Sequence, residues 1–100
     1  SGKGVQIEGK YKSDVLAISS GTVVYSGNAL RGYGNLIIIK HENNFLSAYA
    51  HNYKNLVKEG EKVTKGEKIA QMGKYFDKQV LLHFELRKAG KPVNPSRYIK

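Results

Sequence analysis

The feature that most constrains the fold is a succession of short β-rich runs separated by turn-forming residues. Glycine, asparagine and serine interrupt the chain about every 8–12 residues, which is typical of an all-β sandwich or barrel. The predicted strands are VLAIS (15–19), TVVYS (22–26), NLIIIKH (35–41), FLSAYAH (45–51), KIAQMG (68–73) and QVLLHFELR (79–87). Only the segment 53–58 is compatible with a helical turn, so we expect a mainly β chain.

Length and composition predict one small domain. The chain has 100 residues, of which 40% are hydrophobic, enough for a single core. We expect residues 3–100 to form one domain; Ser1 and Gly2 could be a cloning remnant. The absence of cysteine excludes disulfides and thiolate zinc sites. No run approaches the ~20 apolar residues of a membrane span, and an export signal, if one exists, would lie outside this sequence.

The chain is strongly basic, with 17 Lys and Arg against 8 Asp and Glu and a formal net charge of +9. Such a surface attracts polyanions: nucleic acid, anionic lipid or the acidic polymers of a cell envelope. The basic residues are spread along the chain, and no nucleic-acid motif with interleaved aromatic residues is present. We therefore expect no nucleic-acid partner.

The period of two in β-strands assigns residues to opposite faces. For 79–87, it predicts a core face of Val80, Leu82, Phe84 and Leu86, and an opposite face of Gln79, Leu81, His83, Glu85 and Arg87. For 45–51, it predicts a core face of Leu46, Ala48 and Ala50, and an opposite face of Phe45, Ser47, Tyr49 and His51. If the two strands are neighbours, two histidines, a tyrosine and an arginine line one surface. Leu81 is the apolar exception on that face, and His41 is interpreted as an ordinary surface histidine.

Six motifs, in order, resemble the LytM-type (lysostaphin-like) zinc metallopeptidase domain. They are AISSGTVVYSG (17–27), RGYGNLIIIKH (31–41), LSAYAHN (46–52), VKEGEKVTKGEKIAQMG (57–73), LHFELR (82–87) and GKPVNPSRYI (90–99). The resemblance implies a LytM-type (duplicated-hybrid-motif-like) antiparallel β-sandwich or open barrel with a groove.

Active members of this family carry H-x-x-x-D near the domain start, a histidine after Tyr-Ala, and H-x-H before Phe-Glu. The H-x-x-x-D pair and the second histidine of H-x-H bind zinc, and the other two histidines assist the water and the transition state. Zinc needs three protein ligands and an open position, where it generates hydroxide near neutral pH.

The zinc motif is incomplete in this sequence. The resemblance places Gly2 and Gln6 at the first two ligand positions, and Leu81 at the first histidine of H-x-H. Only His83, at the third ligand position, and His51, after Tyr-Ala, remain. The resemblance therefore implies a degenerate metallopeptidase that is not an enzyme and holds no zinc.

Inactive family members in Gram-negative bacteria activate periplasmic N-acetylmuramoyl-L-alanine amidases, which split septal peptidoglycan during daughter-cell separation. The phrases NALRGYGNLIII, LSAYAHN and GKPVNP are similar to an activator subgroup whose members are outer-membrane lipoproteins. A second activator subgroup tends to lose the histidine that this chain keeps as His51. The resemblance thus implies a periplasmic activator, whose parent protein is anchored to the outer membrane.

The former peptidase groove is the expected partner surface. It comprises Lys3 and Gln6 beside the metal position, Tyr33 and Leu36 as a wall, and Tyr49, His51, Leu81, His83 and Arg87 as the floor. Two alternatives stay open: a passive peptidoglycan-binding module, and a zinc endopeptidase that cuts cell-wall cross-links.

Overall fold

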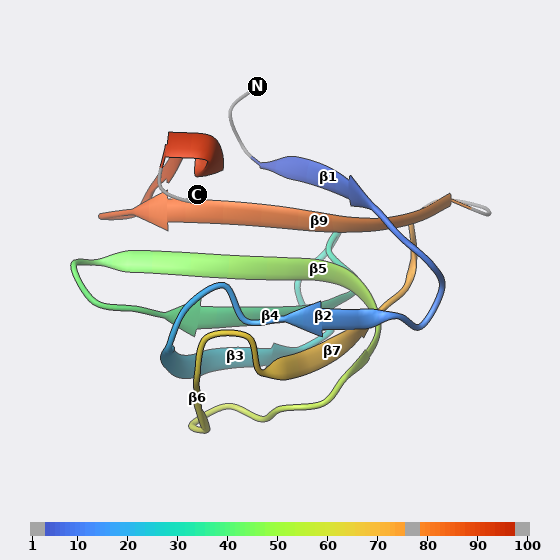
Figure 1. Cartoon of the computed structure of the whole chain (residues 1–100), viewed down its shortest axis with the longest axis horizontal. Helices are drawn as coiled ribbons and strands as arrows, with labels where there is room; N and C mark the ends of the chain where they lie inside the picture. The colour runs from blue at the N-terminus through green and yellow to red at the C-terminus, as the bar shows by residue number, and fades with distance from the viewer. Residues whose placement is uncertain (1–3, 76–78, 98–100) are drawn as a thin grey trace.

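The computed structural model describes residues 4–75 and 79–97, which fold mainly into antiparallel strands joined by turns (Figure 1). The strands are β1 (Val5–Glu8), β2 (Asp14–Leu16), β3 (Gly21–Gly27), β4 (Asn35–Lys40), β5 (Phe45–Asn55), β6 (Lys62–Val63), β7 (Lys68–Met72), β8 (Lys74–Tyr75), β9 (Gln79–Lys88) and β10 (Lys91–Val93), followed by a 3-10 turn, η1 (Pro95–Arg97). The mainly β prediction is confirmed. The helical turn considered for 53–58 is wrong, because β5 continues to Asn55. Within the described ranges no helix is long and apolar enough to cross a membrane.

The long strands β9 and β5 lie side by side at the centre of the site described below. The main sheet runs in the order β1-β9-β5-β4-β3-β6, and β8 and β10 also pair with β9. Figure 1 shows β2 and β7 as a second small layer across the face of β3 and β4. This two-layer antiparallel arrangement agrees with the predicted sandwich.

Strand β5 changes its neighbour in mid-course. Residues 45–50 pair with β9, whereas 52–55 pair with β7, and the register shifts between Asn52 and Lys54. His51 lies at the change with φ 66°, a left-handed conformation that non-glycine residues rarely adopt. Gly73 approaches so closely that a Cβ there would lie 2.3 Å from the His51 carbonyl oxygen. This irregularity carries β7 away from the main sheet into the second layer.

The core lies between the two layers. Its buried residues are Val15, Ala17, Val23, Ile37, Ile39, Tyr49, Val57, Val63, Ile69, Ala70, Met72, Leu82, Phe84 and Leu86. Three of the four β9 residues predicted to face the core are among them, and the fourth, Val80, packs against the cluster. Each large aliphatic residue buried here stabilises the fold by about 1.5–3 kcal/mol.

The predicted faces of β5 are wrong. Tyr49 is paired with Phe84, Ala48 with Glu85 and Leu46 with Arg87, and directly opposed residues share a face. Tyr49 is therefore 1% exposed in the core, and Leu46 and Ala48 lie on the site face. Burial of the Tyr49 hydroxyl is tolerated because it has hydrogen-bond partners. It accepts from the Ile18 amide (3.0 Å) and shares a hydrogen bond with the Ser47 hydroxyl (2.8 Å).

Candidate functional site

A row of four polar side chains runs along one face of β9 and its neighbour β1. Gln6 Nε2 lies 2.8 Å from His83 Nδ1, because β1 pairs these two residues directly. His83 Nε2 lies 2.8 Å from Glu85 Oε2, and Arg87 donates from Nε (3.2 Å) and Nη2 (3.1 Å) to Glu85 Oε1. Residues 83, 85 and 87 share a face because strand side chains alternate. We call these four residues the polar row.

The hydrogen bonds of the polar row fit the Nε2–H tautomer of His83. An amide nitrogen can only donate, so Gln6 requires an unprotonated Nδ1 on His83. The proton then lies on Nε2 and is donated to the Glu85 carboxylate, which is only 5% exposed. Since Glu85 also accepts from Arg87, this buried carboxylate is paired on both oxygens.

His51 lies beside the polar row as the second imidazole of the site. Its ring centroid is 6.2 Å from that of His83 and 4.4 Å from that of Tyr75. Its backbone N–H donates to the Tyr33 carbonyl (2.8 Å), which ties the loop between β3 and β4 to β5. Burial, and after it the neighbouring His83, lower the pKa of His51 below its ordinary value.

An apolar cleft of about 240 Å³ adjoins the arginine end of the polar row. It is lined by Leu30, Tyr33, Leu36, Ile38, Leu46, Ala48, Glu85 and Arg87. The structure thus brings together Tyr33, Leu36 and Arg87 of the expected groove. It adds Leu46 and Ala48, which the sequence had assigned to the core, as well as Leu30, Ile38 and Glu85. The β5–β9 register, which pairs Leu46 with Arg87 and Ala48 with Glu85, is the signal that would have placed Leu46 and Ala48 on the site face.

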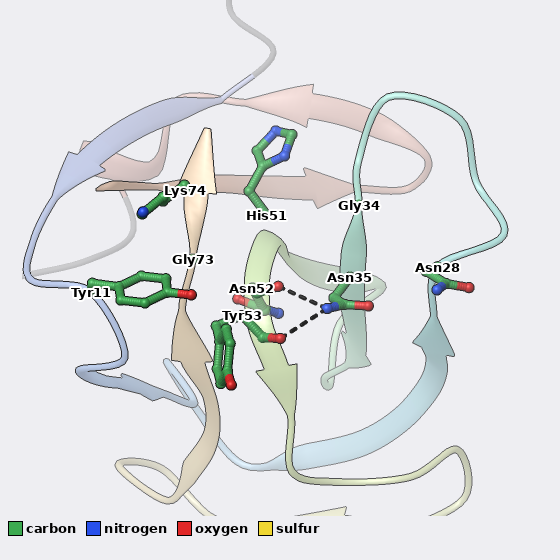
Figure 2. Close-up of a pocket in the computed structure, with 9 residues that line it drawn as sticks. All are labelled: Tyr11, Asn28, Gly34, Asn35, His51, Asn52, Tyr53, Gly73 and Lys74. Atoms are coloured by element: carbon green, nitrogen blue, oxygen red, sulfur yellow. Dashed lines mark hydrogen bonds between the residues drawn. The ribbon is translucent and has the colours of Figure 1, made fainter. Parts of the chain in front are cut away.

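A second cavity, of about 450 Å³, is lined in part by His51 (Figure 2). Its lining comprises Tyr11, Asn28, Gly34, Asn35, His51, Asn52, Tyr53, Gly73 and Lys74. Asn35 Nδ2 donates to the carbonyl oxygens of Asn52 (2.9 Å) and Tyr53 (3.1 Å), which holds the irregular part of β5 in place. Apart from His51, none of these residues was anticipated from the sequence as part of a site.

Other predicted residues are dispersed. Leu81 pairs with Glu8 on the same face of β9 as His83. Lys3 and Gly2 lie outside the described residues. His41 bonds the Ser20 carbonyl (2.7 Å) and the Ser47 hydroxyl (2.7 Å), and this chain continues to Tyr49. His41 is therefore a structural histidine that supports the core.

The donors on this face do not fit a zinc ion. Across 4–75 and 79–97, no three His, Cys, Asp or Glu side chains are grouped so that they could hold a metal. Of the positions that the resemblance assigns to ligands, the described residues contain Gln6 and His83. The Gln6 amide nitrogen points at His83, and both ring nitrogens of His83 have partners within 2.8 Å. A metal would have to break this row to reach the imidazole.

Comparison with known proteins gives the family. The sequence profile described as "Peptidase family M23" matches residues 1–95. The chain belongs to peptidase family M23. This M23 domain is also similar in structure to the catalytic domain of lysostaphin from Staphylococcus simulans, with 28% identity and a TM-score of 0.85 over 95% of this chain and 76% of that one. The predicted family and fold are confirmed.

Two relatives are more similar in sequence. "Murein hydrolase activator NlpD" of Escherichia coli is 55% identical over 97% of this chain and 26% of its own length. "Lipoprotein NlpD/LppB homolog" of Pseudomonas aeruginosa is 53% identical over 97% of this chain and 33% of its own length. The M23 domain thus spans a third or less of these relatives. The predicted similarity to the lipoprotein subgroup of activators is confirmed.

Proposed function

We propose that this M23 domain is non-catalytic and that it binds and activates a periplasmic N-acetylmuramoyl-L-alanine amidase, for septal peptidoglycan splitting and cell separation. The name of the Escherichia coli relative, a murein hydrolase activator, supports this assignment. The lipoprotein name of the Pseudomonas aeruginosa relative supports a lipid-anchored parent protein, and we propose that it is anchored to the outer membrane and faces the periplasm.

The chemistry of the site supports a non-catalytic role. With Gly2 and Gln6 at two ligand positions, His83 is the one remaining zinc ligand that the resemblance assigns. Leu81 replaces an imidazole that would move protons. No catalytic residue is assigned, and the retained His51 and His83 are remnants. We expect no zinc cofactor.

The apolar cleft beside the polar row is the observation that carries the proposal. It offers aliphatic walls and one tyrosine, with the Arg87 guanidinium held at its edge by a buried carboxylate. Tyrosine and arginine are the residue types that most often dominate interface energy. The cleft suits an apolar regulatory segment of the amidase, displaced from the amidase active site. The proposed groove comprises Lys3, Gln6, Tyr33, Leu36, His51, Leu81, His83 and Arg87, and it no longer includes Tyr49.

Activation then follows from differential affinity. A domain that binds only the displaced segment shifts the amidase toward its open form. A difference of about 1–3 kcal/mol between the two amidase states changes the active population by roughly 5–150-fold.

A dye-release assay tests the proposal. Dye-labelled peptidoglycan is incubated with a candidate amidase, with this domain, or with both. We expect release only, or much faster, with both proteins, and less than about 0.1 zinc per chain where a zinc enzyme holds about one. Release by the domain alone with stoichiometric zinc would favour the endopeptidase alternative. Binding to sacculi without stimulation of any host amidase would favour the passive wall-binding module.

A further inference from the structure

A second cation lies in register with Arg87 on the face of the sheet that carries the apolar cleft. Lys40 on β4 is paired with Leu46 on β5, and Leu46, which lines the cleft, is paired with Arg87 on β9. Residues directly opposed across antiparallel strands project from the same face, so Lys40 and Arg87 flank Leu46. Since neighbouring strands lie about 4.8 Å apart, the Cα atoms of Lys40 and Arg87 are roughly 10 Å from each other. We call Lys40 and Arg87 the cation pair.

The Arg87 guanidinium is anchored on one edge and keeps hydrogen-bond donors on another. Its Nε and Nη2 groups donate to Glu85 Oε1, whereas Nη1 has no hydrogen-bond partner among residues 4–75 and 79–97. The Arg87 side chain is 36% exposed, and the Glu85 carboxylate that holds it is buried. A guanidinium presents five N–H donors in a rigid plane that matches the geometry of a carboxylate. Arg87 is therefore oriented to receive a second carboxylate from solvent.

Charge is concentrated at this end of the cleft. Arg87 offsets the charge of Glu85, and Lys40, which is exposed and forms no ion pair with any described residue, adds a positive charge. The rest of the cleft lining is aliphatic except for Tyr33. A polyanion such as nucleic acid would place its further phosphates against this aliphatic lining, where they lose hydration without gaining a partner. The cleft and the cation pair thus suit a ligand with an apolar body and one anionic group.

We infer that the apolar cleft and the cation pair together bind a peptide segment in which an acidic residue follows an apolar stretch. An apolar side chain enters the cleft, and the carboxylate bridges Arg87 Nη1 and the Lys40 ammonium above Leu46. The identity of the partner rests on the proposed function, because this segment is then the displaced regulatory segment of the amidase. The requirement for a carboxylate rests on the cation pair itself. It discriminates against apolar segments that lack an acidic residue, since these desolvate the cation pair without pairing with it.

Three synthetic peptides test this inference. They are amphipathic and identical, except that the residue after a leucine-rich stretch is glutamate, glutamine or lysine. In fluorescence anisotropy, the glutamate peptide should bind about tenfold more tightly than the glutamine peptide, and high salt should reduce this difference. In NMR spectra of the isotope-labelled chain, the glutamate peptide should shift the resonances of Lys40, Leu46 and Arg87. Equal binding of the three peptides, or binding of none of them, would overturn the inference.

Variants of Lys40 separate this inference from the proposed function. Lys40→Gln and Lys40→Glu should raise the domain concentration needed for half-maximal amidase stimulation about threefold and about tenfold, with the maximal stimulation unchanged. Lys88→Gln is the matched control, because Lys88 lies over the Phe45 ring on the opposite face of β9 and its loss changes the net charge equally. Stimulation by Lys40→Glu at an unchanged concentration refutes this inference alone. A preference for the glutamate peptide without stimulation of any amidase refutes the proposed function alone.

Discussion

The His83 imidazole and the Glu85 carboxylate are joined by a hydrogen bond of 2.8 Å between Nε2 and Oε2, two residues apart on one face of β9. Glu85 is 5% exposed and simultaneously accepts two N–H groups of Arg87. His83, which the resemblance assigns to a zinc-ligand position, thus takes part in a continuous hydrogen-bonded row with Gln6, Glu85 and Arg87.

Arg87→Ala should abolish amidase stimulation and leave the fold intact. The substitution removes the guanidinium from the edge of the apolar cleft, and the loss of its bonds to Glu85 should lower the free energy of unfolding by about 1–3 kcal/mol. Dye release and circular dichroism measure the two effects. Tyr33→Ala, on the same cleft, should act similarly. Lys62→Ala on β6, at the opposite end of the strand order, is the matched control. Full stimulation by both cleft variants excludes the cleft as the contact surface.

Glu85→Gln should destabilise the domain, although the two side chains have nearly the same shape. The neutral amide loses the charge that holds His83 and Arg87, and the loss of hydrogen bonds to a charged group costs about 1.5–3 kcal/mol. Urea unfolding gives the change in free energy. Because Arg87 loses its anchor, stimulation should also fall at a temperature where the variant is folded. A variant as stable as the parent would show that the row contributes nothing to stability.

Tyr49→Phe should lower stability without a direct effect on amidase stimulation. The variant retains the ring that packs on Phe84 with centroids 5.4 Å apart. It loses the hydroxyl that satisfies the Ile18 amide and Ser47, at a cost of about 1–3 kcal/mol for the buried groups left unpaired. Thermal unfolding and dye release are measured on the same sample. Loss of amidase stimulation by a fully folded variant would show that Tyr49 contributes to the amidase-binding groove.

Acidification should weaken the fold through His51. Burial and then His83 lower the pKa of His51 from 6.5, so the unfolded chain binds a proton at a higher pH than the folded one. This contribution is fully present above the unfolded-state pKa and is lost as the pH falls from there through the lowered folded-state pKa. Urea unfolding at several values between about pH 7.5 and 5 measures how steeply the free energy of unfolding depends on pH. Asparagine tolerates the left-handed backbone, so the His51→Asn variant should fold and show a weaker dependence of its unfolding free energy on pH. An unchanged pH dependence contradicts the prediction.

Gly73→Ala should disrupt the junction between β5 and β7. Its Cβ would lie 2.3 Å from the His51 carbonyl oxygen and 2.6 Å from the Tyr53 amide nitrogen, and these backbone atoms can move only if the pairing opens. We expect a loss of about 3 kcal/mol or more, with shifts of the His51 resonances. Gly66→Ala is the control for backbone strain without a steric clash, because Gly66 has φ 85° but nothing lies within 4 Å of its added Cβ, and its loss should be the smaller one. An unperturbed Gly73→Ala variant would show that the junction is loosely packed.

The sequence by itself determined the family, the faces of β9 and the strands β2, β3, β4, β5, β7 and β9, but not the short strands β1, β6, β8 and β10. The alternation in QVLLHFELR is unambiguous because polar residues mark one side, so Leu82, Phe84 and Leu86 were correctly assigned to the core. In FLSAYAH, small and apolar residues occupy both sides, and no local rule decides which side is buried.

Tertiary structure decided the rest. The pairing of Tyr49 with Phe84 placed Tyr49 inside, where Ile18 and Ser47 satisfy its hydroxyl. The left-handed residue at His51 ended the alternation, and this brought its imidazole beside His83. Tyr11 and Tyr53 are far apart along the chain and meet because β2, which follows Tyr11, and the end of β5 both pair with β7. Strand periodicity is a local property of the covalent chain, whereas register, bulges and contacts between distant segments depend on how the strands pair.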